Sequence, residues 1–173
     1  PLGLINAISL MTKEEKSKIV INWYGRAEVV SGDTRAFDDS LEKINLNGLN
    51  DILHFNGPAK DISNIMNKAD IIALFSELEG LPNTICEGMM IGKPIIMTKV
   101  SDYSNLVDNS NGFLCDWDKP ESIKNVLVKA SNISIKELRE MGNKSKEKAL
   151  KLFSSEKIIN QWSKLIDNHS KPN

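Results

Sequence analysis

The sequence is poor in cysteine and histidine, with two of each in 173 residues, and neither sign of charge is in excess. Cys86 and Cys115 are too few for a disulfide framework, and two histidines do not complete a structural zinc site. Its 22 basic residues nearly balance 23 acidic ones, so no basic field would attract nucleic acid or an anionic membrane. No apolar run approaches the roughly 20 residues of a transmembrane helix. We therefore expect no nucleic-acid partner and a reducing, cytoplasmic location.

The length and composition predict a single globular domain over residues 1–173. Hydrophobic residues make up 40% of the chain and charged residues 26%, which is typical of a folded domain of this size. The sequence begins at Pro1 without Met and enters apolar-periodic sequence at once. We therefore expect a piece of a longer protein, and we leave open whether residues 1–3 are native.

Short β-rich runs alternate with helical patterns, which predicts βαβ units and a Rossmann-like, doubly wound parallel sheet of the α/β class. The predicted strands are Lys18–Tyr24, Asp51–Phe55, Asp70–Phe75, Pro94–Thr98 and Gly112–Cys115. Asp70–Phe75 is almost wholly apolar, so we expect it to be covered on both faces. Between and after the strands, helical spacing covers Thr34–Leu46, Ile62–Met66, Asn83–Ile91, Pro120–Ala130, Ser134–Leu152 and Ser155–Ile166. The last three helices form a helical C-terminal segment.

The loop after Asp70–Phe75 is the richest in ligand-binding groups. In parallel sheets, ligands bind at the carboxyl ends of the strands, beside the following helix N-termini. Here Asn83 and Thr84 open the next helix, and its free N–H groups and dipole favour a phosphate. Glu87 lies one turn into that helix, within reach of an attached ribose, and Glu79 would face a sugar on the other side of the phosphates. Taken singly, both glutamates also fit ordinary surface acids.

Residues 79–89, Glu-Gly-Leu-Pro-Asn-Thr-Ile-Cys-Glu-Gly-Met, resemble the E-x7-E motif of family 4 retaining glycosyltransferases. These enzymes have the GT-B architecture of two Rossmann-like domains. Further matches are Gly92-Lys93-Pro94-Ile95-Ile96, Asn111-Gly112-Phe113-Leu114, Asp118-Lys119-Pro120-Glu121, Asn56-Gly57 and Ala69-Asp70. The resemblance runs from about residue 4 to residue 152 and implies that the chain is the C-terminal, donor-binding half, without its N-terminal acceptor domain.

The resemblance also implies a role for each residue of the site. The donor sugar is assigned to Glu79, Gly80, Leu81 and Pro82, and the ribose to Glu87. The phosphates are assigned to Gly25, Asn83 and Thr84, and the base to Phe55, Asn56, Gly57 and Pro58. The resemblance implies that no divalent metal is required. No further cofactor is expected, because the nucleotide sugar is itself the substrate in this family.

By the same resemblance, the activity is transfer of a sugar from a nucleotide diphosphate sugar, with UDP favoured, to a saccharide or lipid-linked acceptor. The expected setting is bacterial surface polysaccharide biosynthesis, such as lipopolysaccharide O-antigen or capsule. The acceptor, and any contact with the inner face of the membrane, would be reached through the missing domain. The chain alone is therefore expected to be inactive.

Some positions depart from the family pattern. Leu2 stands where the family has a phosphate-binding Lys, and the strand that would bear its Arg partner is expected before Pro1. Lys99–Asn105 lacks the glycines and the glutamate of the family's D-V-G-G-x-P-E segment, and Lys99 is either an extra cation or a solvated surface lysine. The helix Ser155–Ile166 either crosses onto the missing domain or packs on its own sheet.

Two other functions stay open from the sequence. One is a sugar-nucleotide epimerase of GT-B fold, which would share the donor site but use different acid and base residues. The other is a non-catalytic Rossmann-like module, which would have no affinity for nucleotides.

Overall fold

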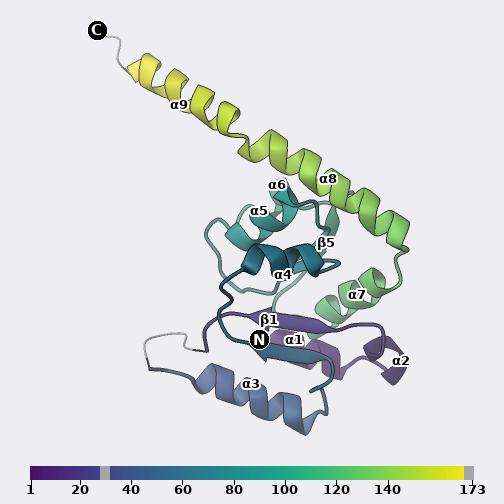
Figure 1. Cartoon of the computed structure of the whole chain (residues 1–173). Coiled ribbons are helices and arrows are strands. Elements are labelled where there is room, and N and C mark those ends of the chain that lie inside the picture. Colours follow the sequence, from purple (N-terminus) through teal and green to yellow (C-terminus); the bar gives the residue numbers. More distant parts are fainter. Residues whose placement is uncertain (28–31, 170–173) are drawn as a thin grey trace.

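The computed structural model describes residues 1–27 and 32–169, with the side chains of residues 168 and 169 excepted. Its strands are β1 (Ile21–Tyr24), β2 (Leu53–Asn56), β3 (Ile72–Leu74), β4 (Ile95–Thr98) and β5 (Gly112–Cys115). Its helices are α1 (Leu2–Ser9), α2 (Lys13–Lys16), α3 (Arg35–Leu46), α4 (Ile62–Lys68), α5 (Asn83–Met90), α6 (Tyr103–Leu106), α7 (Pro120–Ser131), α8 (Ile135–Phe153) and α9 (Ser155–His169). Figure 1 shows their arrangement along the chain.

Every strand predicted from the sequence is present, but three helices are not among the predictions. These are α1, α2 and α6. Only the start of α2 has a signal in the sequence, since Thr12 and Glu15 have the spacing of a capping box. The Glu15 N–H donates to Thr12 Oγ1 at 3.2 Å, and the Thr12 N–H donates to the Glu15 carboxylate at 2.7 Å. Such a reciprocal pair satisfies two N–H groups that a helix start leaves free.

The strands form two parallel sheets. β1 pairs with β2, and β4 lies between β3 and β5, so the predicted parallel α/β class is confirmed. Within residues 1–27 and 32–169, β1 and β3 are not hydrogen-bonded to each other, and the strands do not make one continuous sheet. One hydrophobic cluster still joins the two sheets, because Ile5 of α1 packs in it together with Leu53 of β2 and Ile96 of β4.

Burial differs between β3 and β4. The expectation that Asp70–Phe75 is covered on both faces is wrong, since Ala73 in the middle of β3 is exposed. The physical reason is that the hydrophobic cluster that buries Ile96 does not extend over Ala73, the residue that pairs with Ile96 on β3. β4 is the central strand, and all four of its residues are buried. Its Ile96 packs with α1 on one face, whereas Ile95 and Met97 pack with the buried side of α5 on the other.

The long helix α8 packs closely against the end of α5. A Cβ atom on Gly142 would lie 2.2 Å from the Gly92 carbonyl oxygen, so only glycine allows this approach. α9 continues beyond α8 and extends away from both sheets (Figure 1). Ile159 and Trp162 of α9 are 62% and 60% exposed. The structure therefore excludes the alternative in which this helix packs on its own sheet.

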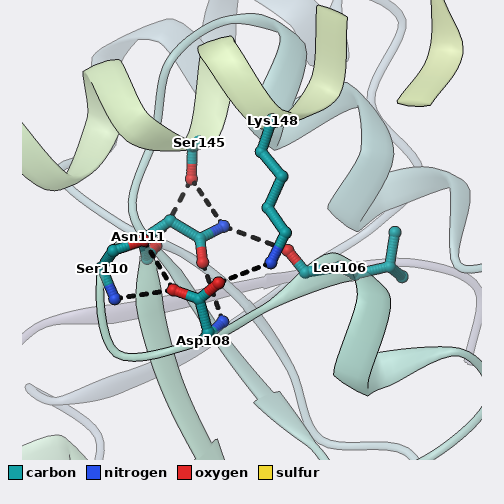
Figure 2. Close-up of polar contacts among 6 residues, drawn as sticks. All are labelled: Leu106, Asp108, Ser110, Asn111, Ser145 and Lys148. Carbon is teal, nitrogen blue, oxygen red and sulfur yellow. Dashed lines mark hydrogen bonds and ion pairs between the residues drawn. The ribbon is translucent and has the colours of Figure 1, made fainter. Parts of the chain in front are cut away.

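A buried asparagine joins α8 to the turn that enters β5 (Figure 2). Asn111 is fully buried. Its Oδ1 accepts from the Asp108 N–H at 2.8 Å, and its Nδ2 donates to the Leu106 carbonyl at 3.1 Å and to Ser145 Oγ at 3.4 Å. Beside it, Lys148 lies 2.7 Å from the Asp108 carboxylate and, together with Ser110, lowers the pKa of Asp108 to about 2. The turn before β5 is thereby held on α8.

We predict that Asn111→Leu lowers the free energy of unfolding by about 3 kcal/mol, because the buried Leu106 carbonyl and the partly buried Asp108 N–H lose their partner. Urea unfolding followed by circular dichroism measures the change. Asn109→Ala, an exposed asparagine in the same turn, is the matched control and should change stability by less than about 0.5 kcal/mol. Equal stabilities for the two variants would show that the Asn111 network does not stabilise the fold.

Candidate functional site

The carboxyl ends of β3, β4 and β5 lie side by side, because the three strands are parallel neighbours. The loop after β3 starts at Phe75 and leads to α5, which begins at Asn83. Lys99 follows β4 directly, and Asp116 follows β5. Ligands of open parallel sheets bind along this kind of edge, so the residues that flank it are the candidate site.

The N-terminus of α5 leaves two N–H groups free at this edge. The Pro82 carbonyl accepts from the N–H groups of Ile85 and Cys86, at 2.9 and 3.1 Å. No side chain caps the helix, and none of the hydrogen bonds among the described residues uses the N–H of Asn83 or Thr84, both of which are exposed. Free N–H groups at the positive end of a helix dipole form an anion site. Asn83 and Thr84 therefore offer two unpaired N–H groups at this edge of the sheet.

Glu79 lies in the loop before α5 and is partly buried. Its Oε1 accepts from the Ser76 hydroxyl at 2.7 Å. The neighbouring Gly80 is exposed, and a Cβ there would meet no atom within 4 Å, so a ligand has access to its backbone. Leu81 is exposed and Pro82 is buried. These four residues, predicted to contact the donor sugar, form one continuous segment beside the α5 N-terminus.

Glu87 lies on α5 and is exposed. It lines a mostly apolar pocket of about 250 Å³ between α4, α5 and the end of α8, together with Ser63, Met66, Cys86, Met90, Ile91 and Phe153. No hydrogen bond or ion pair among the described residues engages the Glu87 carboxylate, so both of its oxygens can accept bonds from a ligand. Cys86 is only partly buried, whereas Cys115 of β5 is buried.

The residues predicted to lie near a base follow β2. Phe55 is engaged in an aromatic cluster, with its ring centroid 5.9 Å from Trp23 and 5.4 Å from Phe37. Its ring therefore supports the fold, whereas Gly57 and Pro58 are exposed at the end of the strand. Asn56 is partly buried, and its Nδ2 donates to the His54 carbonyl at 3.3 Å. Any base contact of this segment would come chiefly from residues 56–58.

Gly25, predicted from the sequence to contact the phosphates, directly follows β1. A Cβ on Gly25 would meet only Trp23 Nε1, at 3.8 Å. The position is therefore open enough for close approach to its backbone. Gly25 and residues 57–58 follow the strands of the β1–β2 sheet, whereas Glu79, Asn83 and Thr84 lie between β3 and β4 of the other sheet.

Lys99 is neither a free cation nor a purely solvated side chain. Its Nζ lies 2.9 Å from the Asp116 carboxylate, and Lys119 approaches the same carboxylate at 3.5 Å. The bond from Lys99 lowers the pKa of Asp116, and Asp116 in turn raises the pKa of Lys99. Trp117, next along the chain, is 43% exposed.

Sequence reasoning missed the bonds that hold the candidate site in place. The Ser76–Glu79 bond joins residues three apart in a loop, a spacing that resembles a capping box but lies outside a helix start. The Thr98 hydroxyl donates to the Ser76 carbonyl at 2.6 Å, and no pattern along the chain indicates that bond. In the part of the chain that the structure describes, no group of three His, Cys, Asp or Glu side chains could hold a metal ion, and no helix could cross a bilayer.

The family model described as glycosyl transferases group 1 matches residues 3–132. Among curated relatives, N-acetyl-alpha-D-glucosaminyl L-malate synthase of Bacillus anthracis is 26% identical over 133 residues, which are 76% of this chain and 34% of the relative. UDP-Gal:alpha-D-GlcNAc-diphosphoundecaprenol alpha-1,3-galactosyltransferase of Escherichia coli is 34% identical over 77 residues, which are 44% of this chain and 20% of the relative.

Solved structures share the fold. Anabaena Alr3699/HepE, crystallised in complex with UDP and glucose, matches with a TM-score of 0.82 and 21% identity. The match covers 96% of this chain and 44% of that one. The chain therefore spans about a third of the first curated relative and less than half of this structural neighbour.

We predict that Lys99→Met raises the pKa of Asp116 toward its ordinary range, since the hydrogen bond and the positive charge are both lost. Because folding lowers this pKa, the stabilisation exists above the pKa of an unfolded aspartate and disappears as the pH falls through the folded value. Carboxyl NMR titration measures the change. Lys119→Met, which removes the more distant amine, should have a smaller effect. An unchanged titration in Lys99→Met would contradict the assignment.

Proposed function

The chain belongs to the family of group 1 glycosyl transferases, and from that membership we propose that it is the donor-binding half of a retaining glycosyltransferase. The donor is a nucleotide diphosphate sugar, and we favour a UDP-sugar. The observation that carries this proposal is the uncapped N-terminus of α5, with free N–H groups on Asn83 and Thr84 and a glutamate on either side of it in the sequence. An anion site flanked by carboxylates, which accept hydrogen bonds from hydroxyl groups, suits a diphosphate that joins two sugars.

The proposed roles follow the order of groups in the donor. The diphosphate lies at the N–H groups of Asn83 and Thr84, with Gly25 on its other side. Glu87 accepts from the ribose hydroxyls, and Glu79 accepts from the transferred sugar, since a carboxylate can accept from two neighbouring hydroxyls. The base lies against residues 56–58 at the end of β2. Lys99, neutralised by Asp116, is not needed as a phosphate ligand in this arrangement.

In the proposed reaction, the bond between the anomeric carbon and the β-phosphate oxygen breaks, and the acceptor oxygen bonds to the same face of the sugar. The proton of the acceptor hydroxyl passes to the departing β-phosphate oxygen, and the nucleoside diphosphate leaves. Charge develops on that leaving group in the transition state, where fixed N–H groups and the helix dipole of α5 stabilise it without reorganisation. We propose that this stabilisation needs no divalent cation, as the family resemblance implies.

The acceptor half of the enzyme is proposed to lie outside this chain, consistent with the chain spanning less than half of its structural neighbours. The exposed apolar side of α9, with Ile159 and Trp162, would pack against that half. The E. coli relative's name gives UDP-Gal as donor and a diphosphoundecaprenol-linked acceptor. We propose a comparable saccharide or lipid-linked acceptor, in bacterial surface polysaccharide assembly on the cytoplasmic side of the membrane.

We predict that this chain binds UDP more tightly than GDP or ADP, and that Glu87→Ala weakens the binding at least about tenfold, because hydrogen bonds from the ribose to a charged acceptor are lost. Isothermal titration calorimetry measures both. Glu42→Ala, which removes an exposed glutamate of α3, is the matched control and should bind as the unaltered chain does.

Tighter binding of GDP or ADP would show that the donor carries another base, and the proposed donor site would still stand. Binding that survives in Glu87→Ala would contradict the assignment of the ribose. No binding of any nucleotide to the unaltered chain would favour the non-catalytic module.

We predict that this chain alone transfers no sugar from a UDP-sugar. The complete natural protein should transfer the sugar, and as fast in the presence of EDTA as in its absence. The transfer product is detected by mass spectrometry. Full activity of the isolated chain would contradict the proposed division into two halves, and an EDTA-sensitive complete enzyme would show that a metal is needed. Formation of an epimerised UDP-sugar without transfer would instead indicate an epimerase.

A further inference from the structure

Two hydroxyl groups connect the central strand of the β3–β5 sheet to the carboxylate of Glu79. The Thr98 hydroxyl donates to the Ser76 carbonyl at 2.6 Å, and the Ser76 hydroxyl donates to Glu79 Oε1 at 2.7 Å. The two bonds run in sequence from the end of β4, through the loop after β3, to the glutamate. They form the only connection of the Glu79 carboxylate to the sheet among the hydrogen bonds and ion pairs of the described residues.

The starting point of this connection is rigid. Thr98 is fully buried at the end of β4. Its own carbonyl accepts from the Val100 N–H at 2.8 Å, and the next residue, Lys99, donates its N–H to the Cys115 carbonyl of β5 at 2.9 Å. A buried hydroxyl whose backbone is bonded on both sides has little freedom to move, so the Ser76 carbonyl is held in one place.

Few side chains of the loop around Glu79 are packed against the fold. Leu78 is 87% exposed and Leu81 is 59% exposed, so neither contributes a packed anchor on either side of Glu79. A partly buried carboxylate in such a loop would otherwise sample several rotamers, and ordering it on ligand binding would cost free energy. The bond from Ser76 restricts Glu79 before any ligand arrives and leaves Oε2 to accept from a ligand.

We propose that Ser76 is a positioning residue for Glu79, and that Thr98 holds Ser76 in the geometry for that role. The proposal rests on the proposed function, in which Glu79 accepts from the transferred sugar. The Ser76 hydroxyl selects the carboxylate orientation that recognises the sugar, so it affects the sugar part of the donor and not the nucleotide part.

The test combines a ligand-free measurement with a binding measurement on the full chain. In Ser76→Ala, the carboxyl ¹³C resonance of Glu79 should shift, because its hydrogen-bond donor is gone. Binding is measured by calorimetry with UDP and with UDP-glucose, UDP-galactose and UDP-N-acetylglucosamine. For the sugar nucleotide that binds best, Ser76→Ala should lose about 3- to 10-fold in affinity, the range for one hydrogen bond, whereas UDP affinity should not change.

Four further variants make the result specific. Ser76→Thr retains a hydroxyl and should restore the affinity for the sugar nucleotide. Glu79→Gln should lose that affinity as well, and adding Ser76→Ala to it should cause little further loss, because the two residues act together. Ser110→Ala removes an equivalent hydroxyl-to-carboxylate bond, 2.5 Å long to Asp108, at a turn outside the candidate site. It should leave both affinities unchanged.

The outcomes separate this proposal from the function on which it rests. An unshifted Glu79 resonance in Ser76→Ala overturns the proposal whatever the chain binds. Equal losses for UDP and the sugar nucleotide also overturn it, since they would indicate a general disturbance of the loop. If Glu79→Gln weakens sugar-nucleotide binding and Ser76→Ala does not, only the positioning role fails. If the unaltered chain binds neither UDP nor a UDP-sugar, the proposed function fails, and this proposal fails with it.

Discussion

The burial of β4 on both faces is the constraint on which the rest of the structure depends. Its side chains alternate between two hydrophobic clusters, with Ile96 packed on the α1 side and Ile95 and Met97 on the α5 side. Because β4 is hydrogen-bonded to β3 and to β5, it fixes the register of both strands and so the position of their carboxyl ends. Those ends form the edge that carries the candidate site. Thr98, the last residue of β4, extends the same constraint into the loop that bears Glu79.

The candidate site combines a rigid frame with groups that the fold leaves unused. The N–H groups of Asn83 and Thr84 are free because no side chain caps α5. The first carbonyl of the helix start, that of Pro82, accepts from the two residues that follow them. Burial of Ile85 and Met89 holds this helix on the sheet. The dipole of α5 is therefore held in place at the strand ends, where a negatively charged group would benefit from it. Glu79 is restrained within this frame, whereas Glu87 projects from it.

Most of the fold could be predicted from the sequence, because periodicity reports burial directly. The five strands, the helices α3 to α5 and the helices from α7 onward follow from apolar spacing and from signals such as the Ser134–Glu137 capping box, whose bonds the structure contains. The helices α1, α2 and α6 were not predicted, since α1 spans only eight residues and α2 and α6 four each, and of these only α2 carried a cap signal. The burial of β3 was overestimated, because an apolar run does not show how far the packed clusters extend over each strand. Whether α9 packs on its own sheet was equally undecidable, since its amphipathic pattern fits any partner.

By itself, the sequence determined the α/β class, the parallel strands and the membership of Glu79, Asn83, Thr84 and Glu87 in one segment. These properties depend on local spacing, which the order of residues contains. Only the tertiary structure decided that the strands form two sheets, that Lys99 is paired with Asp116, and that Thr98 and Ser76 support Glu79. Each of these depends on which strand ends become neighbours and on where a side chain finds its partner. Such contacts arise when distant segments pack, and hydrophobic spacing along the chain carries no record of them.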